Sequence, residues 1–411
     1  MTAFIRSLIS SWCNLSLVAR ILIGLTIGLI LGLTTPSLTG ISILGTLFVG
    51  ALKSIAPILV AVLVASAIAK AQTGLGPRFR MVITLYLLTT FLAGIVAVLG
   101  SMTFPVQLSF NNVIADTSAA PEGLAEIFKG LARGMVANPI AAVSEGNYIC
   151  VLFWAVIIGL ALKKHASEQT IHAVSDFADV ISQAVRWVIQ MAPFGILGLV
   201  FTSVSESGIE IFTTYGWLVA VLLGCMFFMA LVVNPLVVFL FLRKNPYPLV
   251  WKCLKESGLN AFFTRSSAAN IPINMALCKK MNIETDFYSV SIPLGATINM
   301  EGAAITITVI SLAACHTLGI SVTFPTAIVL SILATLAACG TSGIAGGSLL
   351  LIPLACSLFG ISADISMQAV AIGFIIGVVQ DSVETALNSS SDALFTITAE
   401  LFNRKRQNKA G

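Results

Sequence analysis

The sequence predicts an all-α membrane protein that crosses the bilayer about eight times. Of its 411 residues, 57% are hydrophobic and 10% are charged, whereas a soluble domain carries about 25% charged residues. Apolar segments of about 20 residues, the length that spans a bilayer as a helix, recur along the whole chain. The net charge of +4 is small and gives no support for a nucleic-acid partner.

Eight segments are apolar and long enough to be predicted as membrane-spanning helices. Lys and Arg gather after the second, fourth, sixth and eighth of them, whereas the alternate loops are poor in cations. Because cation-rich short loops stay in the cytoplasm, both termini are predicted to be cytoplasmic. The fourth segment is short, and its true start is predicted upstream, near Asn138. The eight segments are 15–34, 41–69, 81–104, 148–162, 171–204, 216–242, 288–318 and 369–401.

Two further apolar regions are interrupted by polar or glycine-rich tips. The first, 248–280, has its tip at 264–270, and the second, 322–360, has its tip at 340–348. Each leg has about 13–15 residues, which is short for a span. Lysines flank the first region on both sides, whereas the second has no Lys or Arg around it. We therefore predict two re-entrant helical hairpins that enter from opposite faces; the alternative is a kinked span, or two spans joined by a short turn.

The last predicted span carries a stripe of polar residues. Asp381, Glu384, Thr385, Asn388 and Asp392 fall at i, i+3, i+4, i+7 and i+11, so a helix points all five in the same direction. Carboxylates at membrane depth are expensive, and they are retained where they face a cavity, a pathway or an ion. This stripe is the first candidate for a functional site.

The span before the second hairpin contains a second polar group of residues. The sequence Asn-Met-Glu-Gly at 299–302 follows Pro293 and Gly295, which loosen a helix and free backbone carbonyls. Freed carbonyls, an amide oxygen and a carboxylate suit a small hard cation; the alternative is a kinked helix whose Asn bonds to a neighbour. A hairpin followed by such a span, repeated in the opposite orientation, is the layout of an inverted repeat with its site at the midplane.

Enzymatic functions find little support in the sequence. Neither hairpin contains a histidine that could activate Ser348, and no Gly-x-Ser-x-Gly elbow occurs. Asp381 and Asp392 lie on one helix about 16 Å apart, so they cannot share a proton as a protease dyad does. The eight cysteines form no Cys-x-x-Cys pair. We predict no catalytic residues and no cofactor.

Four motifs follow one another in the C-terminal part of the chain. They are Thr264-Arg265-Ser266-Ser267 at the first tip, 299–302 in the loosened span, Gly340-Thr341-Ser342-Gly343 at the second tip, and Asp381, Asn388 and Asp392 in the last span. In this order they resemble the dicarboxylate/amino acid:cation symporter family, which includes glutamate and neutral amino-acid transporters. The similarity in hydropathy covers nearly the whole chain, and the bacterial sodium:serine/threonine branch is the most similar.

The resemblance implies an architecture and a mode of action. It implies a homotrimer in the bacterial inner membrane that imports amino acids with sodium by elevator-type alternating access. Residues 1–245 would supply six helices, of which the first, second, fourth and fifth form a scaffold and the third and sixth move. Residues 246–411 would form the transport core, made of hairpin 248–280, unwound helix 285–318, hairpin 322–360 and helix 366–401.

The resemblance also implies the binding residues. Asp381 would hold the substrate ammonium, and Asn388 and Ser267 its carboxylate, with the backbone of 344–346 as a lid. The substrate-binding residues would be Ser266, Ser267, Ile344, Gly346, Asp381, Glu384, Thr385 and Asn388. Three sodium sites would draw on Gly295, Asn299, Asn388 and Asp392, on Thr297, Met300, Ala338 and Thr341, and on Tyr86, Thr89, Thr90, Asn299 and Glu301.

Two departures from the family pattern shape the prediction. Relatives that transport acidic substrates have Arg where this chain has Glu384, and a carboxylate there would repel an acidic side chain. We predict that Glu384 pairs with Arg265. The usual Asp of the family is Glu301 here, which leaves proton coupling open. We predict sodium-driven import of small neutral amino acids, serine and threonine first; the alternatives are a proton-coupled or acidic amino-acid symporter, and more remotely an ion channel.

Overall fold

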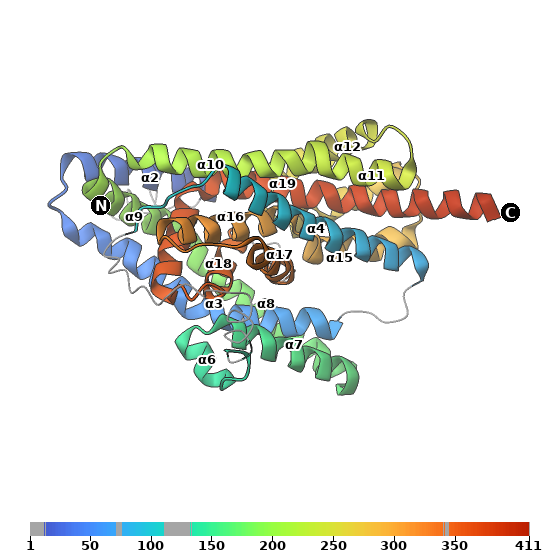
Figure 1. Cartoon of the computed structure of the whole chain (residues 1–411), viewed down its shortest axis with the longest axis horizontal. Helices are drawn as coiled ribbons and strands as arrows, with labels where there is room; N and C mark the ends of the chain where they lie inside the picture. Colours follow the sequence, from blue (N-terminus) through green and yellow to red (C-terminus); the bar gives the residue numbers. More distant parts are fainter. Residues whose placement is uncertain are drawn as a thin grey trace.

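The computed structural model describes residues 12, 14–70, 76–110, 132, 134–339, 341 and 345–410, and every regular element among them is a helix (Figure 1). Seven described helices are long and apolar enough to cross a membrane, or eight if one bent pair forms a single span. The all-α class and the approximate number of spans are therefore confirmed.

Most helices of the first half are separated by short connections, except α4 and α6, between which residues 104–138 lie. Ser16 caps the first helix by accepting from Ala19 N. A 3₁₀ turn at Thr39–Ile41 precedes α3, and a π turn at Met229–Val233 joins α10 to α11. The helices are α2 (Leu17–Thr34), α3 (Ser42–Lys70), α4 (Pro77–Thr103), α6 (Pro139–Glu145), α7 (Tyr148–His165), α8 (Glu168–Gln190), α9 (Ala192–Ser207), α10 (Ile211–Phe228) and α11 (Asn234–Leu242).

The second half consists of two helix–turn–helix units and the long helices that follow them. A π turn at Leu254–Gly258 and a 3₁₀ turn at Ser348–Leu351 lie within the units. The first unit is α12 (Tyr247–Cys253), α13 (Leu259–Thr264) and α14 (Ser267–Lys280), followed by α15 (Thr285–Ile298) and α16 (Glu301–Thr317). The second unit is α17 (Phe324–Ala338) and α18 (Ile352–Ser357), followed by α19 (Ala363–Ala410).

Two predicted spans differ from the structure. The upstream extension of the fourth is wrong, because Gly146 takes a left-handed conformation (φ 71°) and separates α6 from α7. The fifth is not one straight helix, because α8 and α9 meet at an angle of 51°. Pro193 lies at the start of α9, where its missing N–H and its ring prevent α8 from continuing. Proline is favoured in the first turn of a helix, because an N–H there would have no partner within the helix.

Glycine allows α2 to approach α9 closely. Gly24, Gly28 and Gly32 recur every four residues and are buried against α9. A Cβ at Gly28 would lie 2.5 Å from the carbonyl oxygen of Leu197. Small residues at this spacing let membrane helices pack backbone against backbone. The helices α2, α3, α7, α8 and α9 pack mainly on one another, whereas α4 and α10 pack against α16 and α19.

The buried centre of the molecule is formed by α16 and α19. Of the 18 most apolar consecutive residues in Thr285–Thr317, 94% are buried. The helix α19 runs lengthwise through the molecule to the C-terminus (Figure 1). A helix that is buried in this way can carry polar side chains without exposing them to lipid. The centre is therefore where polar groups in the two helices are positioned.

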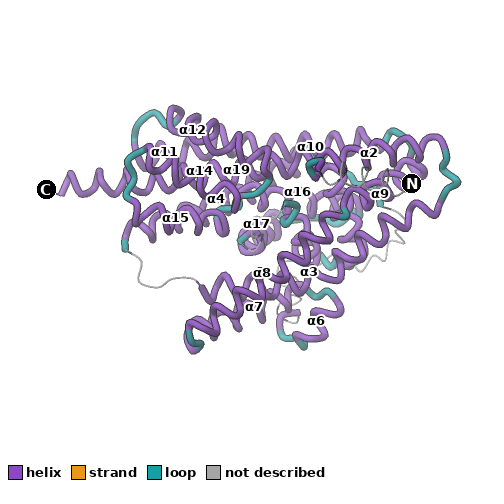
Figure 2. Tube along the Cα trace, turned by 180° about the vertical axis from the view of Figure 1, so that it is seen from behind, coloured by secondary structure: helices purple, strands orange, loops and turns teal. Residues whose placement is uncertain are grey.

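The two helix–turn–helix units open at opposite ends of the molecule. Arg404 donates to the carbonyl of Asn282 (2.7 Å) and Lys405 to that of Leu242 (3.0 Å), so both ends of the first unit lie beside the end of α19. The second unit begins after Thr317, which lies at the other end, where its Oγ1 accepts from Leu108 N (2.7 Å). Figure 2 shows α11, α12 and α14 gathered near the C-terminal end, with α17 farther along.

Gly28→Ala should destabilise the protein by about 1–3 kcal/mol, because the new methyl group overpacks the contact with α9. Gly50→Ala is the matched control, since a Cβ there meets nothing within 4 Å. Thermal unfolding of both variants in detergent measures the difference. Equal melting temperatures would show that α2 and α9 can separate without loss of stability.

Candidate substrate and ion site

The polar stripe of the last span lies on one unbroken helix, as the sequence predicts. All five of its members are buried, with exposed fractions between 0% and 6%. They face α16 and the tips of both helix–turn–helix units rather than lipid.

The Asp381 carboxylate joins the two tips. Its Oδ2 accepts from Arg265 Nε at 2.6 Å, and its Oδ1 accepts from the backbone N–H of Gly346 at 3.1 Å. Arg265 belongs to the first tip and Gly346 to the second. Gly346 has φ 72°, a conformation that favours glycine. One buried carboxylate therefore holds together segments that enter from opposite ends.

The prediction that Arg265 pairs with Glu384 is wrong. Arg265 follows α13 with φ 51°, and its Nη2 donates to the carbonyl of Gly377 at 3.2 Å. This contact places the guanidinium beside the turn of α19 that precedes Asp381. Glu384 lies one turn beyond Asp381, where other groups bind it.

Glu384 is held by three uncharged donors. Its Oε2 accepts from Thr306 Oγ1 (2.7 Å), Ser348 Oγ (2.9 Å) and Gln380 Nε2 (2.5 Å). Sequence reasoning missed Thr306 and Gln380 as partners and considered Ser348 only as a nucleophile. Gln380 could have been found, because it lies four residues before Glu384 on the same helix.

The first tip is attached to α19 by amide side chains. Ser266 caps α14 by accepting from Ala269 N (3.2 Å), and Ser267 is 3% exposed. Asn270 donates to Ser389 Oγ (2.7 Å), and Asn274 donates to the carbonyl of Ser389 (2.9 Å). Asn270 was predicted only as part of the tip and Asn274 was not predicted, although their i, i+4 spacing on one helix was a usable signal.

The predicted break in the unwound span is present. The helix α15 ends at Ile298 and α16 begins at Glu301. Asn388 Oδ1 accepts from Gly302 N (2.7 Å), and its carbonyl accepts from Asn299 Nδ2 (3.3 Å). Asn388 Nδ2 contacts only the Met300 sulfur, at 3.4 Å, among the described residues. The break therefore presents a polar surface to the middle of α19.

Two oxygen atoms at this break suit a cation. Asn299 Nδ2 donates to Asp392 Oδ1 (2.9 Å). Asn299 Oδ1 and Asp392 Oδ2 are buried and have no hydrogen-bond partner in the described part of the chain. Gly295, one turn upstream, leaves room here, because a Cβ on it would lie 2.9 Å from Asp392 Oδ1. Buried orphan oxygens need an explanation, and an amide oxygen beside a carboxylate fits a small hard cation.

The predicted residues of α4 lie against the same break. Tyr86, Thr89 and Thr90 are fully buried. The Tyr86 hydroxyl contacts the carbonyl of Asp392 (3.1 Å), and Thr90 Oγ1 accepts from Met300 N (3.2 Å). These contacts bring the α4 residues to the region predicted to bind ions.

Glu301, predicted with the α4 residues, is fully buried. Its Oε2 accepts from Asn234 Nδ2 (2.8 Å). Asn234 is a partner that the sequence analysis missed, since nothing in an apolar span indicates which helix face meets Glu301.

The remaining predicted residues are more dispersed. Ala338 and Thr341 are buried at the end of α17, where Cys339 Sγ contacts the Ile298 carbonyl at 3.7 Å. The Thr297 side chain is exposed and bonds to its own helix. Thr385 Oγ1 donates to the carbonyl of Asp381 at 2.7 Å. Ile344 lies outside the described residues.

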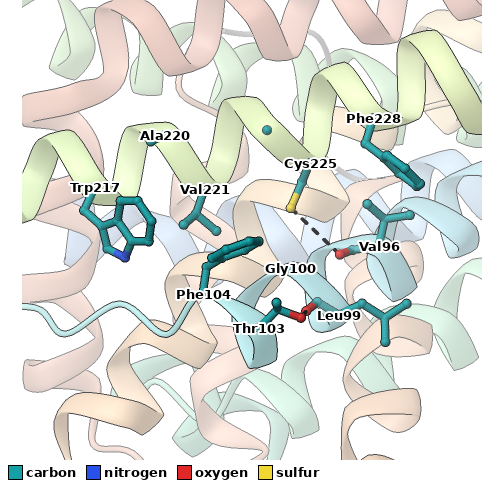
Figure 3. Close-up of a pocket in the computed structure, with 11 residues that line it drawn as sticks. Val96, Leu99, Gly100, Thr103, Phe104, Trp217, Ala220, Val221, Cys225 and Phe228 are labelled. Atoms are coloured by element: carbon teal, nitrogen blue, oxygen red, sulfur yellow. Dashed lines mark hydrogen bonds between the residues drawn. The ribbon is translucent and has the colours of Figure 1, made fainter.

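A large apolar cavity lies elsewhere, between α4 and α10. It has a volume of about 490 Å³, and Figure 3 shows Phe104, Val221 and Trp217 around it. The Cys225 thiol donates to the Val96 carbonyl at 3.8 Å on its wall. None of its lining residues is charged, so this cavity lacks the groups that would orient a zwitterion or an ion.

Comparison with known proteins shows the family to which the chain is related. The model of the sodium:dicarboxylate symporter family matches residues 17–401. A protein named serine/threonine transporter SstT from Bifidobacterium adolescentis is 58% identical over 396 residues, which cover 96% of this chain and 92% of the relative. Proteins of the same name from two strains of Streptococcus thermophilus are 54% and 55% identical over 395 residues, covering 96% of this chain and 98% of each relative. The predicted family resemblance is confirmed.

Asp392→Asn should weaken binding of sodium at least about a hundredfold, because removing one partner of a buried charge interaction costs about 3–5 kcal/mol. The measurement is the sodium concentration that gives half of the sodium-induced rise in melting temperature. Asp364→Asn is the control, since the Asp364 side chain is 82% exposed and pairs with Lys53. An unchanged midpoint in Asp392→Asn would exclude this carboxylate as an ion ligand.

Proposed function

Because the chain belongs to the sodium:dicarboxylate symporter family, and is therefore a transporter and not an enzyme, we propose that it imports serine and threonine together with sodium. The names of relatives at 54–58% identity support this substrate class. The observation that carries the proposal is the buried Asp381 carboxylate at the junction of the two tips.

Asp381 is the counter-ion for the substrate ammonium. An α-amino acid presents a cation that matches a buried carboxylate, and Arg265 occupies Asp381 Oδ2 in this structure. The substrate ammonium takes over part of this interaction when it binds. Since Gly346 N also binds Asp381, substrate binding is linked to the position of the second tip.

The substrate carboxylate is received by Asn388, Ser267 and the start of α14. Asn388 Oδ1 is engaged by Gly302 N, whereas Nδ2 has only a sulfur contact among the described residues. Nδ2 is thus available as a donor. Ser267 lies in the first turn of α14, and free N–H groups at a helix N-terminus attract carboxylates.

Glu384 excludes acidic substrates. It lies one turn from Asp381 on the same face, and a second negative side chain beside it would be repelled in a dry site. A serine or threonine hydroxyl can instead donate to a carboxylate. Such hydrogen bonds to charged groups are worth about 1.5–3 kcal/mol.

Sodium and substrate are coupled through Asn388. Its backbone carbonyl accepts from Asn299 Nδ2. The side-chain oxygen of Asn299, like Asp392 Oδ2, has no hydrogen-bond partner among the described residues. An ion that fixes Asn299 therefore also fixes the residue that receives the substrate carboxylate. By linkage, each ligand then raises the affinity for the other. Proton coupling through Glu301 is the second candidate, favoured by its orphan Oε1.

The transport cycle moves one part of the chain against another. Helices α2, α3, α7, α8 and α9 form the scaffold within residues 1–245, and α4 and α10 move with the transport core of 246–411. The packing of α4 and α10 on α16 and α19 supports this division. The two units are re-entrant hairpins in the bacterial inner membrane, both termini are cytoplasmic, and the protein is a homotrimer, as the family resemblance implies.

Uptake of radiolabelled serine into proteoliposomes tests the function. With an inward sodium gradient, serine should accumulate above its external concentration, because sodium entry drives it. Replacing sodium by choline under an inward proton gradient should abolish accumulation. Undiminished uptake in choline would favour proton coupling instead, and flux that does not saturate with serine would indicate a channel.

Asp381→Asn should lower the affinity for serine more than about a hundredfold, because breaking a buried charge pair costs about 3–5 kcal/mol. Isothermal titration calorimetry in sodium measures it. Ser382→Ala is the control, since the Ser382 hydroxyl bonds to the carbonyl of Val378 in its own helix. Binding within tenfold of the parent would make Asp381 a purely structural residue.

Glu384→Gln should increase inhibition by aspartate at least about tenfold relative to threonine, because it removes the like charge and keeps an acceptor for Thr306 and Ser348. Competition of unlabelled amino acids against labelled serine measures this. Arg265 is left unchanged, because its partner is Asp381. If aspartate already inhibits the parent as strongly as threonine does, Glu384 does not exclude acidic substrates.

A further inference from the structure

Asn234 is a buried amide within an otherwise apolar membrane segment. It is 2% exposed and begins α11, directly after the π turn Met229–Val233 and before Pro235. π turns inside helices are frequent at functional sites. A buried amide inside a membrane needs a polar partner, and residues of this kind mark function more often than packing.

The partner of Asn234 is Glu301, at the start of α16. Asn234 Nδ2 donates to Glu301 Oε2 at 2.8 Å, and Glu301 is fully buried. The pair is nevertheless half satisfied. Asn234 Oδ1 and Glu301 Oε1 are both buried without a hydrogen-bond partner among the described residues. Two orphan oxygens on one hydrogen-bonded pair would be costly without a ligand.

We infer that Asn234 is a positioning residue for the ion site around Glu301. Resting on the proposed sodium coupling, this inference adds α11 to the elements that form the site. Asn234 fixes the Glu301 carboxylate through Oε2 and leaves Oε1 for a small cation. A glutamate has three rotatable side-chain bonds, so a buried partner is needed to hold it in one position.

The test is sodium-dependent stabilisation of the purified full-length protein, without substrate. The variants Asn234→Leu, which keeps the branched shape of asparagine, and Asn234→Ala both remove the donor that holds Glu301. Each should raise the sodium concentration at half-maximal stabilisation at least about tenfold, because a hydrogen bond to a charged group is lost. The matched control is Ser311→Ala, which removes a buried hydroxyl from α16 that has no partner in the described chain and should leave the midpoint unchanged.

A double variant separates positioning from packing. Because Asn234 acts through Glu301, Asn234→Leu combined with Glu301→Gln should shift the sodium midpoint no further than Glu301→Gln alone. A packing role would instead lower the melting temperature without sodium and leave the midpoint unmoved.

The outcomes distinguish this inference from the proposed function. If the parent responds to sodium and both Asn234 variants respond at the same concentration, the role of Asn234 is overturned and sodium coupling stands. If the parent shows no response to sodium, the ion site and the proposed coupling both fail.

Discussion

The organisation of the molecule depends on one buried carboxylate. Asp381 accepts from Arg265 in the first tip and from Gly346 in the second, so segments that enter from opposite ends meet at one point of α19. An unpaired carboxylate at this depth would be prohibitively costly. The tips therefore have to close on Asp381, or on a ligand that replaces one of them. This requirement connects the fold to the transport cycle.

The described residues of the two tips are attached to α19 by different kinds of contact. The first is held by Asn270 and Asn274 as well as by Arg265, whereas the second is held by Gly346 N and by Ser348 on Glu384. Amide side chains that bond to a neighbouring helix from inside the membrane are worth about 0.6–2 kcal/mol each. Both described contacts of the second tip with α19 are thus made to carboxylates of the candidate site.

Several buried oxygens at and beside the break between α15 and α16 lack hydrogen-bond partners within the described chain. Asn299 Oδ1, Asp392 Oδ2, Glu301 Oε1 and Asn234 Oδ1 are four buried oxygens without partners among the described residues. The side-chain oxygens of Asn270 and Asn274 in α14, by contrast, accept from Asn260 and Asn270. Carboxylate and amide oxygens without other partners are suitable ligands for a small hard cation. The proposed ion would therefore also complete the packing of the broken helix.

The sequence by itself determined the class, the order of the spans and the polar stripe, because hydropathy and a 3.6-residue period depend only on neighbours along the chain. It also located the break at 299–302, because Pro293 and Gly295 act locally. Only the tertiary structure decided that Arg265 binds Asp381 and not Glu384, and that Asn234 reaches Glu301. These contacts join residues 67 to 116 positions apart. Whether Arg265 binds Asp381 or Glu384 depends on how the first tip packs against α19. A pattern of neighbouring residues in the sequence cannot predict that packing.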